Sequence, residues 1–364
     1  MCAWLTDVLS HLAAAILSLY SSDQPPPAPA PARPAAPAPT LRQVVGQHMV
    51  FAYDGLVPPP ALRRRIARGE AAGVIVFARN VRSAGQLRAT MRSLQAIRRP
   101  RGLRAPLIVM ADQEGGPVRR IPGAPRRAAA QAGSAARAGA DGLAAARTLR
   151  GAGVNMNLAP VADVGRPGAA LEGERRIYAR SSTRVAQLAS AFARGLHAGG
   201  VRATAKHYPG FGAATVNTDD APAQIAAPLE QLRAIDEPPF ARLVRDGVDA
   251  VMLSTAVYPA VDALPAAFSP RWVTAELRER LGFAGVTMTD DLGTPAVAAY
   301  GTHRARVLRA VRAGIDLPLF SSSYAASATA AEGLLAAARR GELDEAALRA
   351  AAARVLALRA KLPR

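Results

Sequence analysis

The chain has 364 residues, 50% of them hydrophobic, and a formal net charge of +19 at pH 7. Its length accommodates one large or two ordinary domains with a substantial core. Arginines are spread over nearly every predicted helix and only 5% of residues are aromatic. This argues against nucleic-acid binding, which concentrates charge and interleaves stacking rings, and favours attraction to an anionic surface such as an envelope polymer.

The N-terminus divides into an apolar leader over residues 1–22 and a Pro/Ala-rich linker over residues 23–40. The apolar run at 8–20 is too short and interrupted for a membrane span, and no Lys or Arg precedes it. The composition of the linker predicts an extended, semi-rigid segment. Together these segments predict an exported protein or one attached to the membrane or cell envelope. A cytoplasmic protein with a misplaced start codon is the alternative.

From residue 41 to 364, short apolar runs alternate with amphipathic stretches. The predicted strands are Gln47–Tyr53, Gly73–Phe77, Leu107–Ala111, Val154–Pro160, Arg202–Lys206, Ala250–Ser254, Gly285–Thr289 and Gly314–Phe320. The predicted helices are Pro60–Glu70, Ala84–Arg98, Ser134–Gly151, Thr183–Ala198, Pro228–Asp246, Pro270–Leu281, His303–Ala313 and a final pair over 325–362. This alternation predicts a (β/α)8 TIM barrel. An open doubly wound sheet is the alternative, but its glycine fingerprint is missing after the first strand.

Polar residues gather where the predicted strands end, which is the catalytic rim of such a barrel. They are Asp54, Arg79, Asn80, Asp112, Gln113, Glu114, Asp163, Lys206, His207, Ser254, Thr255, Asp290 and Asp291. Lys206 is one of only two lysines in an arginine-rich chain, and an ammonium is a compact donor that a guanidinium cannot replace in a tight pocket. Paired carboxylates near a cation are typical of glycosyl transfer chemistry.

Five segments in this order resemble the family 3 glycoside hydrolases, and most of all their single-domain β-N-acetylhexosaminidase branch. They are Val74–Asn80, Ala111–Gly116, Asn157–Val164, Lys206–Gly210 and Gly285–Leu292. The resemblance runs from about Val44 to Leu319 and implies a carbohydrate substrate. It implies that Asp290 is the catalytic nucleophile, with Asp291 structural. The remaining implied site residues bind the sugar: Asp112, Arg120, Arg176, Lys206 and His207.

The loop after Lys206-His207 departs from that branch, in which an Asp-x-His dyad supplies the general acid/base. Here Asn217 stands at the Asp position and Asp219 at the His position. One account makes Asp219, or its neighbour Asp220, the acid/base, because burial or the Asp290 charge can raise a carboxyl pKa. The other account is a loop that has lost proton transfer, leaving a site that binds sugar without turnover.

The sequence therefore predicts a retaining hydrolase that releases terminal β-linked sugars. The predicted sugar is N-acetylglucosamine from cell-wall glycans, and a β-glucosidase-like activity is the alternative. A catalytically impaired glycan-binding barrel and a basic surface-binding scaffold are the alternatives. No cofactor is expected. Cys2 is the single cysteine, and the five histidines lack zinc-binding spacing.

Overall fold

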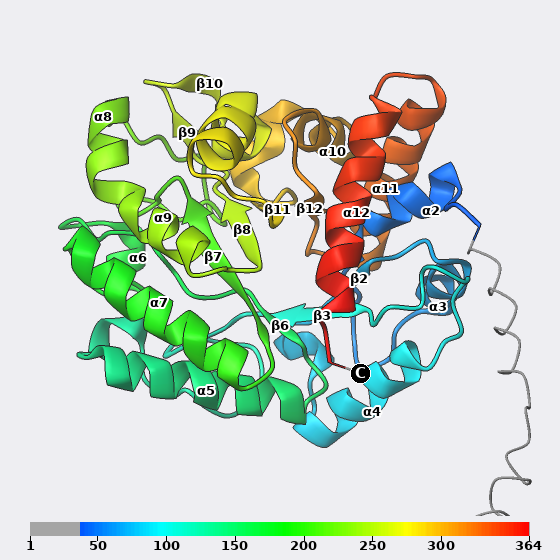
Figure 1. Ribbon diagram of the computed structural model, residues 1–364, viewed down its shortest axis with the longest axis horizontal. Helices are drawn as coiled ribbons and strands as arrows, with labels where there is room; N and C mark the ends of the chain where they lie inside the picture. The colour runs from blue at the N-terminus through cyan, green and yellow to red at the C-terminus, as the bar shows by residue number, and fades with distance from the viewer. Residues whose placement is uncertain (1–36, 364) are drawn as a thin grey trace, which may run out of the picture. The chain divides into compact units, whose positions relative to one another are not determined.

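A computed structural model describes residues 37–363 (Figure 1). The predicted leader (1–22) and residues 23–36 of the predicted linker lie outside the described residues. An eight-stranded sheet with parallel neighbours forms the centre. Its order is β1 (Val50–Phe51), β2 (Gly73–Ile75), β3 (Ile108–Ala111), β6 (Met156–Asn157), β7 (Arg202–Tyr208), β8 (Ala250–Leu253), β11 (Val286–Asp291) and β12 (Leu317–Leu319). The end strands β1 and β12 approach each other, and the predicted (β/α)8 barrel is confirmed.

Helices follow the strands and form the outer layer (Figure 1). They are α3 (Pro60–Arg68), α4 (Ala84–Gln95), α5 (Ala135–Gly151), α7 (Ser182–Ala198), α8 (Leu229–Gln231), α9 (Pro238–Arg245), α10 (His303–Arg312), α11 (Tyr324–Arg339), α12 (Glu345–Ala360) and the π-helical segments η3 (Leu232–Asp236) and η5 (Arg271–Arg280). Side-chain caps fix several starts; Ser134, for example, accepts the Arg137 N–H at the start of α5. Among residues 37–363, no helix is long and apolar enough to cross a membrane.

The strand predicted from Gln47 begins too early. Thr40 and Gln43 form a capping box that starts a helix, α2 (Leu41–Gln47), so Gln47 ends a helix and the strand begins at Val50. Short elements without periodicity were not predicted at all. These are α6 (Ala170–Gly173) and the two-stranded pairs β4 (Gln113–Gly115) with β5 (Val118–Arg119) and β9 (Val257–Tyr258) with β10 (Asp262–Pro265).

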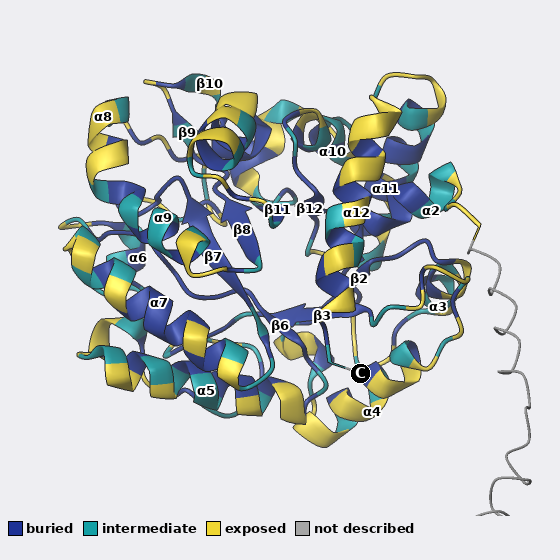
Figure 2. Ribbon diagram, viewed as in Figure 1, coloured by how far each residue is buried: buried dark blue, intermediate teal, exposed yellow. Residues whose placement is uncertain are grey.

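Alternate residues of the barrel strands belong to different parts of the core. On β2, Val74 joins the outer core beneath the helices, whereas Ile75 joins the barrel interior. The strands are therefore buried on both faces (Figure 2). On α12, Val355 and Leu358 pack into the interior cluster. This helix covers the end of the barrel where the strands begin and leaves the opposite end free for a pocket.

Candidate active site

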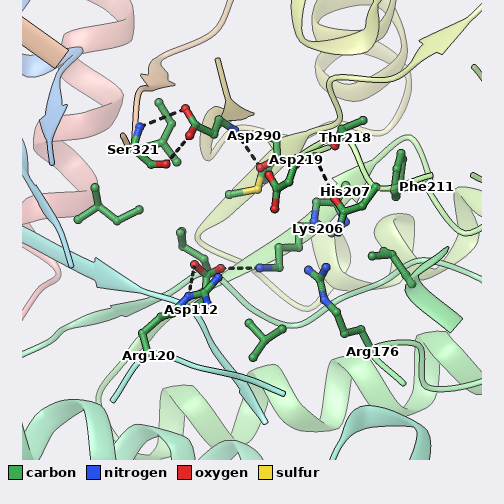
Figure 3. Close-up of a pocket in the computed structure, with 18 of the residues that line it drawn as sticks. Asp112, Arg120, Arg176, Lys206, His207, Phe211, Thr218, Asp219, Asp290 and Ser321 are labelled. Atoms are coloured by element: carbon green, nitrogen blue, oxygen red, sulfur yellow. Dashed lines mark hydrogen bonds and ion pairs between the residues drawn. The ribbon is translucent and has the colours of Figure 1, made fainter. Parts of the chain in front are cut away.

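A pocket opens at the carboxyl end of the barrel strands, and about 690 Å³ of empty space, part of it open solvent, lies in and before it. Its apolar floor consists of interior core residues, namely Ile75, Leu158, Met252 and Leu319. All seven residues predicted to act in the site line this pocket: Asp112, Arg120, Arg176, Lys206, His207, Asp219 and Asp290. Figure 3 shows them converging from several loops and strand ends.

Lys206, at the end of β7, anchors one side of the pocket. Its Nζ lies 2.7 Å from Asp112 Oδ1 and 2.7 Å from Glu114 Oε1. Burial alone would lower the pKa of Lys206, but the two carboxylates outweigh it and raise that pKa above its ordinary value. The ammonium therefore stays charged in a buried position and can donate to a ligand hydroxyl.

Glu114 was not predicted as a site residue, although it holds two of the predicted cations. Its carboxylate accepts a bidentate pair from Arg176, at 2.9 Å and 2.9 Å, as well as the Lys206 contact. Burial would raise the pKa of Glu114, but Arg176 and Lys206 hold it well below its ordinary value. A signal was present in the Asp112-x-Glu114 spacing, because residues two apart on an extended segment share a face.

His207 is oriented by Asp163, which is fully buried after β6. The Asp163 carboxylate accepts the backbone N–H of His207 at 3.2 Å and of Phe211 at 2.7 Å, and lies 2.8 Å from His207 Nδ1. Because Asp163 accepts at Nδ1, Nε2 of the neutral ring is left as an acceptor for a ligand hydroxyl. Asp163 thus contributes to the site by fixing the orientation of the His207 ring.

Arg120 lies at the pocket mouth, with its Nε 3.7 Å from Asp112 Oδ2 and its guanidinium over the Phe77 ring. Arg79 stacks on the same ring but pairs with Asp54 at 3.2 Å. Neither Asp54 nor Arg79 lines the pocket. These two predicted rim residues therefore shape the surrounding loops.

Other predicted rim residues are also structural. Asn80 is buried and donates to the carbonyls of Tyr53 and Gly55 at 2.9 Å and 2.8 Å. Ser254 and Thr255 are buried outside the pocket lining. Proximity to a strand end places such residues at the correct end of the barrel without bringing them into the pocket. Asn80 is held by the carbonyls of a neighbouring loop, Ser254 Oγ accepts the Ala256 N–H of its own loop, and the Thr255 hydroxyl has no hydrogen-bond partner among the described residues.

Asp290 and Asp291 end β11 and have different surroundings. Asp291 accepts the N–H groups of Gly293 at 2.7 Å and Ser321 at 3.1 Å, and the Ser321 hydroxyl. Burial raises its pKa. Asp290 accepts the Asp291 N–H at 2.9 Å through Oδ1, and both side chains line the pocket. The contacts of Asp291 fit a structural role and leave Asp290 oriented toward a ligand.

Asp219 lies on the loop after β7, near Asp290 in the pocket (Figure 3). Loss of hydration among the surrounding atoms, and then the charges of Asp290 and Asp291, raise the pKa of Asp219 to about 6. Asp220 is exposed, as is Asp219, but it does not line the pocket. His303 begins α10 and stacks edge-on against Phe320, outside the pocket lining.

The pocket therefore combines a cation-rich side around Lys206 with a pair of carboxyl groups, Asp219 and Asp290 (Figure 3). One of these is poised to hold a proton at mildly acidic pH. Within residues 37–363, no group of three or more His, Cys, Asp or Glu side chains is arranged to hold a metal ion. The arrangement suits acid–base chemistry on a polar, uncharged ligand.

Residues 41–358 match the family model described as "Glycosyl hydrolase family 3 N terminal domain". The chain is 38% identical over 344 residues to an uncharacterised secreted glycosyl hydrolase of Arthroderma benhamiae, covering 90% of this chain and 96% of that protein. It is 36% identical over 271 residues to a β-hexosaminidase of Pseudomonas aeruginosa, covering 73% and 79%.

Solved structures show the same relationship. A family 3 β-N-acetylglucosaminidase from Paenibacillus sp. str. FPU-7 aligns with a TM-score of 0.83 and 33% identity over 89% of this chain, which spans only 63% of that longer protein. A β-N-acetylhexosaminidase from Beutenbergia cavernae aligns with a TM-score of 0.80 and 31% identity, covering 88% of this chain and 99% of that one.

Proposed function

The chain belongs to glycosyl hydrolase family 3 and is an O-glycosyl hydrolase, and from this premise we propose that it releases terminal β-linked N-acetylglucosamine with retention of configuration. Asp290 is the nucleophile and Asp219 is the general acid/base. The choice of N-acetylglucosamine as the released sugar is supported by the names of the hexosaminidase relatives. The side-chain geometry of the pocket supports the residue roles.

One observation carries the assignment: the side chains of Asp219 and Asp290 line the same pocket, where burial and then the neighbouring carboxylates raise the pKa of Asp219 to about 6. A retaining hydrolase needs one ionised carboxylate to attack the anomeric carbon and one protonated carboxyl to protonate the leaving oxygen. The Asp290 charge itself favours the protonated form of Asp219. Two aspartates of the same chemistry thus acquire different roles from their surroundings.

The reaction proceeds in two steps. Asp290 attacks the anomeric carbon while the Asp219 proton passes to the departing glycosidic oxygen, which leaves a glycosyl ester on Asp290. Asp219, now a carboxylate, takes a proton from water, whose oxygen displaces Asp290 and regenerates both groups. Asp112, Lys206 and His207 hold the hydroxyls of the sugar. Arg176 supports this group through Glu114.

The nucleophile is tested by incubating the protein with an activated fluoroglycoside of N-acetylglucosamine, which leaves a slowly hydrolysed glycosyl-enzyme. We expect a mass gain of one glycosyl unit on the peptide that contains Asp290, and no gain in Asp290→Asn. Turnover by Asp290→Asn should fall by at least about 10³-fold. A label on another carboxylate would overturn the assignment of Asp290.

The acid/base is tested with Asp219→Ala on aryl β-N-acetylglucosaminides. The turnover rate should fall on the order of 10²–10⁴-fold for substrates with a poor leaving group, and only slightly for those that release dinitrophenolate. Azide should accelerate turnover of the activated substrate and yield a β-glycosyl azide. In the wild type, kcat/KM should fall as pH rises above about 6. If Asp219→Ala hydrolyses natural glycans at the wild-type rate, Asp219 is not the acid/base.

The same measurements decide the second candidate, a glycan-binding barrel without efficient turnover. The replacement of the branch's histidine by Asp219 is the observation that favours it. Sugar binding without a covalent adduct at Asp290 would establish that function. Export is proposed on the basis of the secreted relative and is tested by locating the protein in culture medium, envelope and cytoplasm.

A further inference from the structure

Glu174 joins the sugar-binding side of the pocket to the loop that carries Asp219. It follows α6, and its side chain is 37% exposed. One carboxylate oxygen, Oε2, accepts from Arg176 Nη1 at 3.0 Å, and the other, Oε1, accepts from Asn217 Nδ2 at 2.9 Å. The same carboxylate therefore contacts an arginine that lines the pocket and a residue of the catalytic loop.

Asn217 in turn determines where Asp219 lies. Its side-chain Oδ1 accepts the Asp219 N–H at 3.1 Å, and its carbonyl accepts the N–H groups of Asp220 at 3.0 Å and Ala221 at 3.1 Å. This is an Asx-type turn, in which the asparagine side chain fixes the backbone two residues later. A displacement of Asn217 would therefore move Asp219.

The loop is fixed at both ends but weakly in its middle. Near its start, the Ala214 carbonyl accepts the Ala170 N–H at 2.9 Å, and near its end Gln224 bridges Val257. Between these points, among the described residues, the Glu174 to Asn217 bond is the one hydrogen bond that ties residues 215–222 to other parts of the chain. Asp219 lies in this span.

We propose that Glu174 is a positioning residue that holds Asp219 over the sugar pocket through Asn217; this inference rests on the proposed function of Asp219. It also gives a reason for the asparagine at 217. The amide Nδ2 donates to Glu174, whereas a carboxylate at 217 would place two negative charges in contact. Asp219 here depends on a partner outside its own loop.

The proposal is tested by reversing the donor and acceptor of this bond. Glu174→Gln cannot accept from both Arg176 and Asn217, and Asn217→Asp loses the donor and adds repulsion. In the double variant, the new amide at 174 can donate to the new carboxylate at 217 while its oxygen still accepts from Arg176. Glu172→Gln is the matched control, because Glu172 pairs with Arg180 at the surface two residues away.

We expect each single variant to lower kcat about tenfold or more for aryl β-N-acetylglucosaminides with a poor leaving group, because small misplacements of an acid are costly. The loss with dinitrophenolate should be much smaller, since little proton donation is then needed. The double variant should recover most of the loss. Glu172→Gln should match the wild type, and melting temperatures should show that every variant folds.

Three outcomes would overturn the role of Glu174: single variants as active as the wild type, losses that are equal for all leaving groups, or a double variant no better than the singles. Asp219→Ala is assayed in parallel on the same substrates. If its loss depends on the leaving group and that of Glu174→Gln does not, only this inference fails. If the loss in Asp219→Ala does not depend on the leaving group, the proposed acid/base itself fails.

Discussion

Replacing Asp219 by asparagine should stabilise the folded protein at alkaline pH. The pKa of Asp219 is about 6 in the folded chain against an ordinary value of 3.8. Below pH 3.8 the carboxyl is protonated in both the folded and the unfolded chain, so its charge does not affect the free energy of unfolding. As pH rises from 3.8 to 6, the unfolded chain releases the proton first, so the free energy of unfolding falls. Above pH 6 the carboxyl is ionised in both states, and the free energy of unfolding stays lowered by the full amount.

The difference between 3.8 and about 6 corresponds to ~3 kcal/mol. Asp219 is open to solvent at the pocket mouth, and water screens part of this effect, so we expect ~1–2 kcal/mol at pH 8. Asp219→Asn removes the charge while keeping the shape of the side chain. The variant should therefore be more stable than the wild type at pH 8 and nearly equal at pH 4, although it loses catalytic activity.

The assay is urea unfolding at pH 4, 6 and 8, with Asp220→Asn as the control for loss of one negative charge from the same loop. The pH-dependent gain should be specific to Asp219→Asn. An equal gain at pH 4 and pH 8 would show that the carboxylate charge is not its source. No gain at pH 8 would refute the raised pKa and, with it, the main support for Asp219 as a proton donor.

Lys206→Met should lower the free energy of unfolding by ~3 kcal/mol and abolish sugar binding, because it leaves buried carboxylates without their ammonium; urea unfolding and ligand titration measure both effects. Gly212→Ala should lower kcat and cost ~1–3 kcal/mol of stability, since a Cβ there would lie 2.0 Å from the Val164 carbonyl oxygen and push the catalytic loop outward. Asp316→Asn should cost ~3 kcal/mol or more but leave kcat unchanged, because the fully buried Asp316 pairs with Arg354 away from the pocket.

The barrel could be predicted from sequence because its strands are buried on both faces and separated by amphipathic helices. Each of the eight predicted strands overlaps an observed strand of the central sheet, although β7 and β11 continue two residues past their predicted ends. The early start at Gln47 failed because the capping box at Thr40 starts a helix within an apolar stretch. Short pieces such as α6 could not be predicted, since four residues show no period.

The seven predicted site residues line one pocket, whereas Glu114 and Asp163, which orient some of them, were predicted only as rim residues without a role. The end of a predicted strand indicates which side chains reach the rim, and this signal was sufficient to identify Lys206 and Asp290 as pocket residues. The partner of a rim residue comes from another strand or loop: Glu114 reaches Arg176 and Asp163 reaches His207. Such pairs are 44 to 62 residues apart in sequence, and only the three-dimensional fold brings them together.

The distribution of charge across the pocket explains how a strongly basic chain can keep a carboxyl group protonated. On one side, Asp112 and Glu114 are neutralised by direct contacts to Lys206 and Arg176. On the other side, Asp219 has no such ion pair among the described residues. Loss of hydration raises its pKa most, the negative charges of Asp290 and Asp291 raise it further, and Arg176 opposes them more weakly. A cation in contact with Asp219 would lower that pKa and remove the proton that departure of the aglycone requires. The proposed role of Asp219 as an acid therefore requires that no arginine contacts its carboxyl group.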